Sequence, residues 1–504
     1  MSSRRGFLGY AGAATAPVLL GACGGGTSSP GKGGTVRAAF PGFGAKETMD
    51  PHVGRQFVDQ ARHKAVFDKL IELDSQLKPV PGLARRWESS DDLTVWRLHL
   101  RSARFHDGHQ LDAEDVLFTL ARILDPKSAE RLAKSSLSLI DLKHSRALGK
   151  RGVELRLKRP NAELPSLLAF TGTFVVSRRY RDPEKPVGTG PFRFGSFSPG
   201  RQFTGSRFDD YWAGPAHIDE LSILSAESEA RSNAVRAGEI EYAHEMSPAF
   251  ARTVGKGSAV RIVAAPACGV EGILLKTDRP PFDDPDAAMA MKLLADRGRL
   301  VEVVLGGRGT VGNDMYGKGF VYYPELPQRE RDVAEARRLL RRSGALNEKL
   351  TFYTSTATDT FVQAAHLFAH QASEAGLRID VTTGPAESYF TDILHTGTIT
   401  SHRSGAMPIP TYISERLLSD APQNATAWQH EDFDADFREA QSTKETGKRA
   451  RRYSAVQRTL RDEGGLLLWG HPDWLNAVSR RLHGVRAAPP NTRDWARFDT
   501  VRLD

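Results

Sequence analysis

The stretch from Pro79 to Pro126, PVPGLARRWESSDDLTVWRLHLRSARFHDGHQLDAEDVLFTLARILDP, contains the clearest local structure signals of the chain. Polar and apolar residues alternate between Thr94 and Arg101, with Trp96, Leu98 and Leu100 sharing one side. A period of two residues is typical of a strand with one buried face. The first half of the stretch therefore predicts a half-buried β-strand.

The second half of the same stretch predicts a turn and then a helix. Asp107-Gly108 is a turn dipeptide. Asp112 stands where a helix N-cap is expected, because Asp115 follows three residues later. The apolar stripe of this helix is formed by Val116, Leu120 and Leu124.

The remaining chain repeats this mixture of strands and helices without a fixed period. Residues 188–200 predict a glycine-rich segment that leads into a strand. Residues 229–243 predict a helix that ends at Gly238, followed by another strand. Helices are also expected over residues 286–306 and immediately before Gly344. Such alternation predicts α/β architecture, and 504 residues are enough for two or three lobes.

Composition excludes several classes of protein. With 40% hydrophobic and 26% charged residues the chain is ordinarily globular, and its formal charge of +8 is a mild excess. Arginines within residues 337–342 are spaced beside Leu339 and Leu340, which indicates a solvated helix face. We therefore expect no nucleic-acid partner. The only two cysteines, Cys23 and Cys268, exclude a disulfide framework.

The first residues have the order of an export signal. Arg4 and Arg5 precede a charge-free run from Gly6 to Ala22, which is too short and too rich in Gly and Ala to span a bilayer. Ser3 to Leu8 resembles a twin-arginine motif, and Leu20-Gly21-Ala22-Cys23 resembles a lipobox. This resemblance implies a signal over residues 1–22 and lipid attachment at Cys23, followed by a flexible tether over residues 23–33. The alternative is an amphipathic helix, which Gly24-Gly25-Gly26 disfavours.

No catalytic motif is complete. The sequence contains no Gly-x-Ser-x-Gly elbow and no phosphate-binding Gly-x-x-x-x-Gly-Lys-Ser/Thr loop. Glu47 replaces the third glycine of a dinucleotide motif, and His106 and His109 flank a turn rather than completing a metal-ligand set. We expect a protein that is not an enzyme and that holds no cofactor and no metal.

Five segments resemble the extracytoplasmic solute-binding proteins, family 5, of peptide and nickel ABC importers. They are the opening stretch together with VGTGPFRFGSFSPG, DDYWAGPAHIDEL, EARSNAVRAGEIEYA and PFDDPDAAMAMKLLADRGRLVEVVLGG, within Gly34 to Val485. The resemblance implies an α/β, two-lobed periplasmic-binding-protein-like fold of type II with an extra subdomain inserted in the first lobe. Lobe I would comprise residues 34–55, 169–272 and 470–504, the inserted subdomain residues 56–168, and lobe II residues 273–469. Hinge strands would lie near Val270 and Trp469.

The resemblance also implies a function. The chain would be an extracytoplasmic substrate-binding lipoprotein, anchored to the outer face of the cell membrane or periplasmic. It would capture a peptide or peptide-like solute by lobe closure and deliver it, as a monomer, to an ABC permease with its ATPase subunits. A nickel, metal-chelate or oligosaccharide receptor of the same fold remains open, as does a secreted hydrolase.

Candidate ligand-binding residues follow from the same resemblance. Many peptide-binding members carry an acidic motif of Asp-Tyr-Pro-Asp-Pro type that pairs with the peptide N-terminus, but no acid stands between Ser404 and Thr411. A buried ammonium group without a carboxylate partner costs several kcal/mol, so this contact is not expected here. Arg403 could instead meet a carboxylate or phosphate, or it could be an ordinary exposed arginine. The candidate cleft residues are Phe43, Arg403, Gly405, Met407, Tyr412 and Trp428, of which the apolar ones could equally be core.

Overall fold

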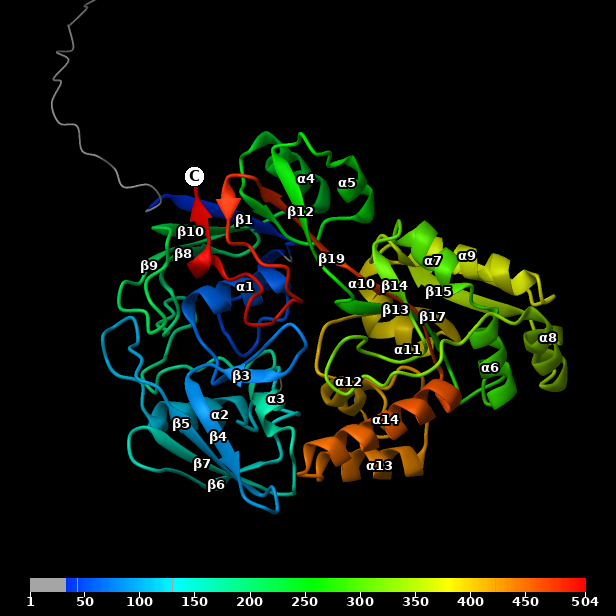
Figure 1. Ribbon diagram of the computed structural model, residues 1–504, viewed down its shortest axis with the longest axis horizontal. Coiled ribbons are helices and arrows are strands. Elements are labelled where there is room, and N and C mark those ends of the chain that lie inside the picture. Colours follow the sequence, from blue (N-terminus) through cyan, green and yellow to red (C-terminus); the bar gives the residue numbers. More distant parts are fainter. Residues whose placement is uncertain (1–32, 43, 129, 422) are drawn as a thin grey trace, which may run out of the picture.

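The computed structural model describes residues 33–504 except 43, 129 and 422. The expected export signal with Arg4 and Arg5, the lipid-attachment residue Cys23, the tether up to residue 32, and Phe43 lie outside the described residues. The described chain forms three larger sheets and two two-stranded ones, with flanking helices, which confirms the mixed α/β class. Figure 1 shows the two larger sheets side by side and the third beneath the first.

The first sheet has seven strands in the order β12-β19-β11-β1-β10-β9-β8. Its central strand β1 runs parallel to both β10 and β11. Helix α1 (Phe57–Val66) packs against this sheet, and α4 (Ser228–Ala237) and α5 (Pro248–Thr253) lie beside β11 and β19. The strands are β1 (Thr35–Phe40), β8 (Phe192–Ser198), β9 (Gln202–Arg207), β10 (Glu220–Ser225), β11 (Tyr242–Ala243), β12 (Val260–Ala265) and β19 (Trp474–Ser479).

The second sheet has six strands in the order β14-β18-β13-β17-β15-β16, with β15 parallel to β16 and β17. Helices α7 and α9 pack on it, and α13 and α14 pair with each other (Figure 1). The strands are β13 (Gly269–Leu275), β14 (Gly309–Val311), β15 (Leu350–Ser355), β16 (Ile379–Gly384), β17 (Ile399–Gly405) and β18 (Leu466–Pro472). The longer helices are α6 (Pro285–Leu294), α7 (Arg297–Val304), α8 (Val333–Arg342), α9 (Phe361–Ser373), α12 (Ile409–Arg416), α13 (Glu431–Gln441) and α14 (Thr446–Glu463).

The third sheet has the order β4-β5-β7-β6, and its strands β4 and β5 come from the stretch Pro79 to Pro126. The predicted strand is β5 (Val95–Leu100), whose alternate residues are buried, and the predicted helix is α2 (Ala113–Ile123). The Asp112 side chain accepts hydrogen bonds from the backbone N–H groups of Glu114 and Asp115, which confirms the cap. The other elements are β4 (Ala84–Ser89), β6 (Ile140–Ala147), β7 (Gly152–Leu157), α3 (Leu164–Leu168) and the hairpin β2 (Ile71–Leu73) with β3 (Pro79–Pro81).

The remaining elements are short. Beyond β16 a helical turn α10 (Ala386–Ser388), a π-turn (Tyr389–Ile393) and α11 (Leu394–Thr396) lead into β17. The C-terminal hairpin pairs β20 (Leu482–His483) with β21 (Arg502–Leu503). Both helices end at the predicted glycines: Gly238 directly follows α4, Gly344 follows α8 after Ser343, and both glycines adopt positive φ.

The chain crosses between the two large sheets twice (Figure 1). Residues 266–268 join β12 to β13, and Asp473 alone joins β18 to β19. The two crossings are hydrogen-bonded to each other, since the Cys268 N–H donates to the Pro472 carbonyl at 2.9 Å and the Ala267 N–H donates to Asp473 Oδ1 at 3.3 Å. Any rotation of one sheet against the other is therefore concentrated in four neighbouring residues.

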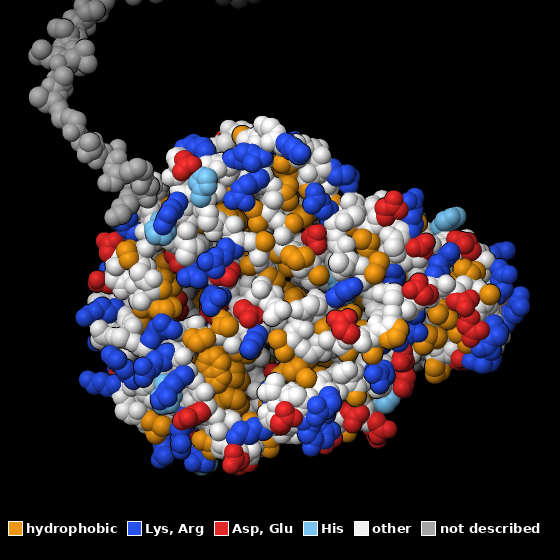
Figure 2. Space-filling view, in the orientation of Figure 1, with side chains coloured by type: hydrophobic (Ala, Val, Ile, Leu, Met, Phe, Trp, Pro, Cys, Tyr) orange, Lys and Arg blue, Asp and Glu red, His pale blue; other side chains and the backbone are white. Residues whose placement is uncertain are grey.

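The expected solvated helix face at residues 337–342 is confirmed. The arginine run lies on α8, where Leu339 and Leu340 are buried and Arg338, Arg341 and Arg342 are exposed. Figure 2 shows acidic and basic side chains interspersed over the visible face. None of the helices that the structure describes combines the length and hydrophobicity that a bilayer-spanning helix needs.

Gly188, in the segment before strand β8, lies against the C-terminal end of helix α1. A Cβ atom at this position would collide with the Val66 carbonyl oxygen, which is backbone and has no other rotamer. We expect Gly188→Ala to lower the free energy of unfolding by about 2–3 kcal/mol, the cost of overpacking. Urea denaturation measures this effect.

Gly255 provides the matched control, because a Cβ atom there would meet nothing within 4 Å. Gly255→Ala should change stability by less than about 0.5 kcal/mol. Equal destabilisation by the two substitutions would show that the close approach at Gly188 carries no special cost.

Candidate functional site

A cavity of about 270 Å³ lies between the two large sheets, beside the crossings. Residues of the first sheet and its helices form one wall, including Glu245 and Trp474. Residues of the second sheet and its loops form the other, including Glu271, Asp359 and Arg403. A cavity walled by two separate lobes is a common position for a ligand site.

Arg403 on β17 lines this cavity and contacts residues of both walls. One terminal guanidinium nitrogen donates to Glu245 Oε1 at 2.6 Å, which links the two lobes. Its Nε lies 3.8 Å from Glu271 Oε1 on the neighbouring strand β13, where the two residues are directly paired. The guanidinium carbon stands 5.5 Å from the centre of the Trp474 ring, within the range of a cation–π contact.

Glu271 is the most buried acid of the cavity, with 3% of its surface exposed. Burial raises the pKa of its carboxyl from 4.5 to about 7, against the opposing effects of Arg403 and of the hydrogen bond from the Thr360 hydroxyl. Further acids in the wall are Glu227, Asp359 and Asp473, and further bases are Arg231 and Arg308. Acidic and basic residues therefore line the same cavity, which suits a solute that carries both charges.

The burial of Glu271 predicts a pH-dependent stability. In the unfolded chain this carboxyl titrates near 4.5 and in the folded chain near 7, so the folded state binds the proton more tightly. The stabilisation is fully present below pH 4.5 and is lost as pH rises through 7. Relative to Glu271→Gln, the wild type should lose on the order of 2–3 kcal/mol across this range. Urea unfolding of both proteins from pH 4 to pH 8 measures the difference, and parallel profiles would contradict it.

The structure places the other described candidates beside the cavity or in the core. Gly405 ends β17, and a Cβ atom there would lie 3.8 Å from the Phe57 ring of the opposite lobe. The Met407 N–H donates to the Tyr316 hydroxyl at 2.8 Å, and Met407 is mostly buried. Tyr412 stacks on Tyr316 with ring centres 3.7 Å apart, so its ring is occupied by protein.

Trp428 lies in the core of the second lobe. It packs against Phe433 with ring centres 4.8 Å apart, and it does not line the cavity that holds Arg403. Arg403 is thus the one candidate among the described residues that the structure puts into this cavity wall.

Among the residues that line this cavity, only Arg403 was predicted from the sequence; those that were missed include Glu245, Glu271, Asp359 and Trp474. One signal was available, because Glu271 is a lone acid within the apolar strand sequence GVEGILL. A charged residue on a fully buried strand is rarely there without a charged partner or a ligand. Nothing comparable marks Glu245, which the fold brings to Arg403 from 158 residues away.

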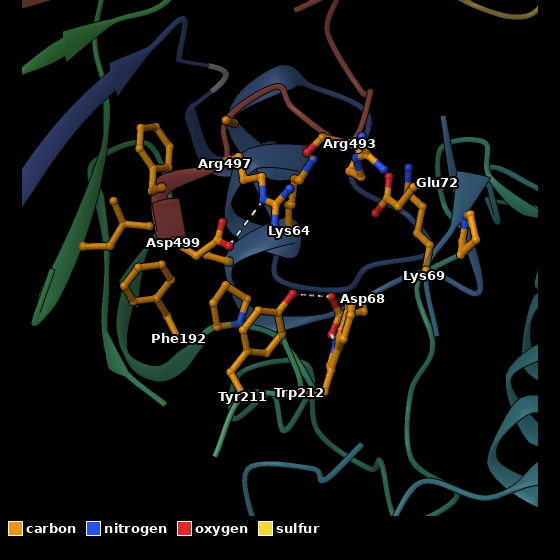
Figure 3. A pocket seen from close by; sticks show the side chains of 17 residues that line it. Lys64, Asp68, Lys69, Glu72, Phe192, Tyr211, Trp212, Arg493, Arg497 and Asp499 are labelled. Atoms are coloured by element: carbon orange, nitrogen blue, oxygen red, sulfur yellow. Dashed lines mark hydrogen bonds and ion pairs between the residues drawn. The ribbon is translucent and has the colours of Figure 1, made fainter. Parts of the chain in front are cut away.

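A smaller cavity of about 50 Å³ lies inside the first lobe between α1 and the C-terminal segment. In Figure 3, Tyr211 points to Asp68 at its floor, and Arg497 pairs with Asp499. Asp68 also accepts hydrogen bonds from Trp212 and Thr189. The buried Asp68 side chain thus already has three protein donors.

Among the described residues, no group of three or more His, Cys, Asp and Glu side chains is arranged to hold a metal ion. His106 and His109 point to other partners: His106 Nε2 contacts the Gly190 carbonyl oxygen, and His109 stacks on Phe105. Cys268 is buried and forms no disulfide.

Comparison with known proteins agrees with this geometry. The family model described as "Bacterial extracellular solute-binding proteins, family 5 Middle" matches residues 78–424. A probable di/tripeptide-binding protein 5 of Pseudomonas aeruginosa is 27% identical over 349 residues, 63% of this chain and 66% of that protein.

Solved structures show the same fold at lower identity. The periplasmic binding protein DppA of Helicobacter pylori, in complex with peptide STSA, is 19% identical and has a TM-score of 0.79 over 94% of this chain and 98% of its own. NikZ of Campylobacter jejuni, in complex with Ni(L-His), is 16% identical and has a TM-score of 0.81 over 93% and 99%. The predicted two-lobed periplasmic-binding-protein fold is thereby confirmed.

Proposed function

Because this chain belongs to the bacterial extracellular solute-binding proteins of family 5, whose members are extracytoplasmic, we propose that it is the substrate-binding lipoprotein of an ABC importer. It captures a peptide or peptide-like solute between its lobes and delivers it to a permease that is driven by ATPase subunits. Acylation of Cys23 after export through the Arg4-Arg5 signal holds it at the membrane surface. In this proposal the protein delivers its solute as a monomer.

The observation that carries the proposal is the cavity between the lobes, whose walls are linked by the ion pair of Arg403 with Glu245. A carrier must enclose its solute and then release it unchanged, which needs a cavity that opens by movement of its walls. Within the described residues, the chain passes from one wall to the other only at the two hydrogen-bonded crossings, residues 266–268 and 473. We assign the hinge to these crossings.

The charges of the cavity favour a zwitterionic solute. The stretch from Ser404 to Thr411 contains no acid, but Glu245, Glu271 and Asp359 supply carboxylates from other elements. These groups can pair with an ammonium group of the solute, and Arg403 or Arg308 can pair with its carboxylate. A free peptide or an amino-acid derivative carries both charges.

Native mass spectrometry tests the proposal. The protein from Gly34 onward is purified without denaturant, and any small molecule that it retains is released and identified. We expect a peptide or another zwitterionic solute, recovered chemically unchanged after return to the protein. Conversion of the returned solute would instead support a hydrolase, and bound nickel would support a metal-chelate receptor.

An oligosaccharide in the released fraction would overturn the zwitterion assignment while it leaves the receptor role intact. If the folded protein retains no small molecule, it is titrated with a mixture of di- and tripeptides. Absence of binding in that titration would contradict the peptide assignment.

A further inference from the structure

The boundary between the four-stranded sheet and the second lobe is joined by direct contacts between protein groups. The Ala162 N–H donates to the Gln441 carbonyl oxygen at 2.7 Å, and the Val321 N–H donates to the Gln76 carbonyl oxygen at 3.1 Å. Within the described residues no chain crossing lies here, so these contacts can break when the lobes separate. Figure 1 shows this boundary, with α3 on one side and α14 on the other, away from the two crossings.

Glu163 is a buried acid of this boundary, with 4% of its surface exposed. It stands directly before α3, on the side of the four-stranded sheet. Its Oε1 accepts a hydrogen bond from the Tyr322 hydroxyl at 3.0 Å and lies 3.1 Å from the Nε of Arg449 on α14. Its Oε2 accepts from the Ser166 hydroxyl at 3.3 Å. Two groups of the second lobe thus meet one carboxylate oxygen of the opposite side.

Tyr322 is fixed by contacts within the second lobe. The Gln457 side chain donates to the Tyr322 carbonyl oxygen at 2.8 Å, the Tyr453 ring centre lies 4.6 Å from its ring centre, and Arg449 Nε donates to its hydroxyl at 2.8 Å. Its φ of 75° is a left-handed backbone conformation, which a non-glycine residue keeps only where its surroundings enforce it. The hydroxyl is therefore presented to Glu163 in a defined position.

The buried contact differs from an exposed ion pair at the same boundary. Lys444 Nζ lies 2.6 Å from Asp91 Oδ1, but both side chains are exposed, and exposed pairs add little stability. The Arg449 side chain is only 13% exposed. If Arg449 is removed while the boundary stays closed, Glu163 remains a buried charge without its counter-charge. Loss of Arg449 therefore disfavours the closed arrangement.

We propose that Glu163, Tyr322 and Arg449 form a latch that favours closure of the lobes at the end of the boundary away from the hinge. They act as positioning residues, since none of them lines the cavity around Arg403. The inference rests on the proposed function, in which the solute is held by the closed arrangement. The apparent affinity for a solute is its intrinsic affinity multiplied by the closed fraction, so the latch strengthens capture from a distance.

Cross-linking across the boundary in solute-free protein tests the latch. In the chain from Gly34 onward, Asp91→Cys and Lys444→Cys place exposed thiols on opposite sides of the boundary. A short bismaleimide attached to one thiol reaches the other only when the boundary closes, so the rate of cross-linking follows the closed fraction. Cys268, the only other cysteine from Gly34 onward, is buried.

In this background Arg449→Met should slow cross-linking about 10-fold, and Tyr322→Phe, which removes only a hydroxyl, about 3-fold. Arg452→Met is the matched control, because Arg452 lies on the same helix but pairs with Glu439 of α13, within the second lobe. It should leave the rate within about twofold. Equal rates for Arg449→Met and Arg452→Met would overturn the latch.

Adding Glu163→Gln to Arg449→Met distinguishes the latch from local support, because Arg449 also donates to the carbonyl oxygens of Thr443 and Lys444 between α13 and α14. The second substitution removes the carboxylate that the first leaves unpaired, so cross-linking should recover in part. A double variant as slow as Arg449→Met alone would show that Arg449 only supports this loop, and would overturn the latch. Because no solute is present, failure of the latch and failure of the proposed function give separate results.

Discussion

Arg403→Met is expected to lower the affinity for the captured solute by about 10- to 100-fold while the protein remains folded. The guanidinium group holds Glu245 of one lobe and lies beside Glu271 of the other. Without it, two carboxylates face each other across the cavity, and their repulsion favours the open arrangement. Calorimetric titration with the solute released from the wild type measures the loss.

Arg207→Met is the matched control for this substitution. Arg207 forms ion pairs at 2.8 Å with Asp209 and Asp219, and 31% of its side chain is exposed compared with 29% for Arg403. It lies outside the cavity and should leave the solute affinity unchanged. An Arg403→Met variant that binds like the wild type would contradict the assignment of this arginine.

A double variant separates two roles of Arg403. Glu245→Gln added to Arg403→Met removes one of the facing carboxylates. If Arg403 acts by favouring closure, the double variant should regain part of the lost affinity. If Arg403 acts by touching the solute, the affinity should stay low.

Asp314→Asn is expected to lower the free energy of unfolding by about 3–5 kcal/mol. Both Asp314 oxygens accept from one terminal nitrogen of Arg297 at 2.8 Å, and Oδ2 also accepts from Arg329 Nε at 3.0 Å. The Leu468 N–H of β18 donates to Oδ1 at 3.1 Å. Because the Arg297 side chain is only 3% exposed, loss of the carboxylate leaves a buried cation uncompensated.

Asparagine suits this position, since Asp314 has a φ of 57° and asparagine tolerates left-handed backbone. The substitution therefore isolates the charge. Asp462→Asn is the control in the same network, because Asp462 pairs with Arg329 but is 42% exposed. It should cost less than about 1 kcal/mol. Urea midpoints that are equal for the two variants would show that burial does not govern these pairs.

The local structure of the chain was predictable because it depends on neighbours in sequence. The alternation around Trp96 and the cap at Asp112 each involve residues within a few positions, and both reappear as β5 and α2. The helix ends at Gly238 and Gly344 likewise depend on local backbone geometry, because both glycines adopt positive φ. Family resemblance then supplied the arrangement of the lobes, which periodicity alone does not contain.

The site was predictable only in part, because it is made by long-range pairing. Arg403 was found as the charged residue of a stretch in which the expected acid is missing. Its partners Glu245 and Glu271 come from two other elements, and their proximity depends on the strand pairing of β13 with β17 and on contact between the lobes. A large aromatic residue such as Tyr412 or Trp428 can lie in a cleft or in the core, and the sequence does not distinguish the two. In the structure Tyr412 stacks on Tyr316 and Trp428 packs on Phe433.

Small-angle X-ray scattering of the protein, first stripped of solute and then resaturated, tests capture between the lobes most directly. Capture by lobe closure, as proposed, predicts that saturation lowers the radius of gyration, because rotation about the proposed hinge at residues 266–268 and 473 would bring the lobes together at the contact of Arg403 with Glu245. Arg403→Met should reduce the change at equal solute concentration. Full saturation without any change in the radius of gyration would contradict capture by lobe closure.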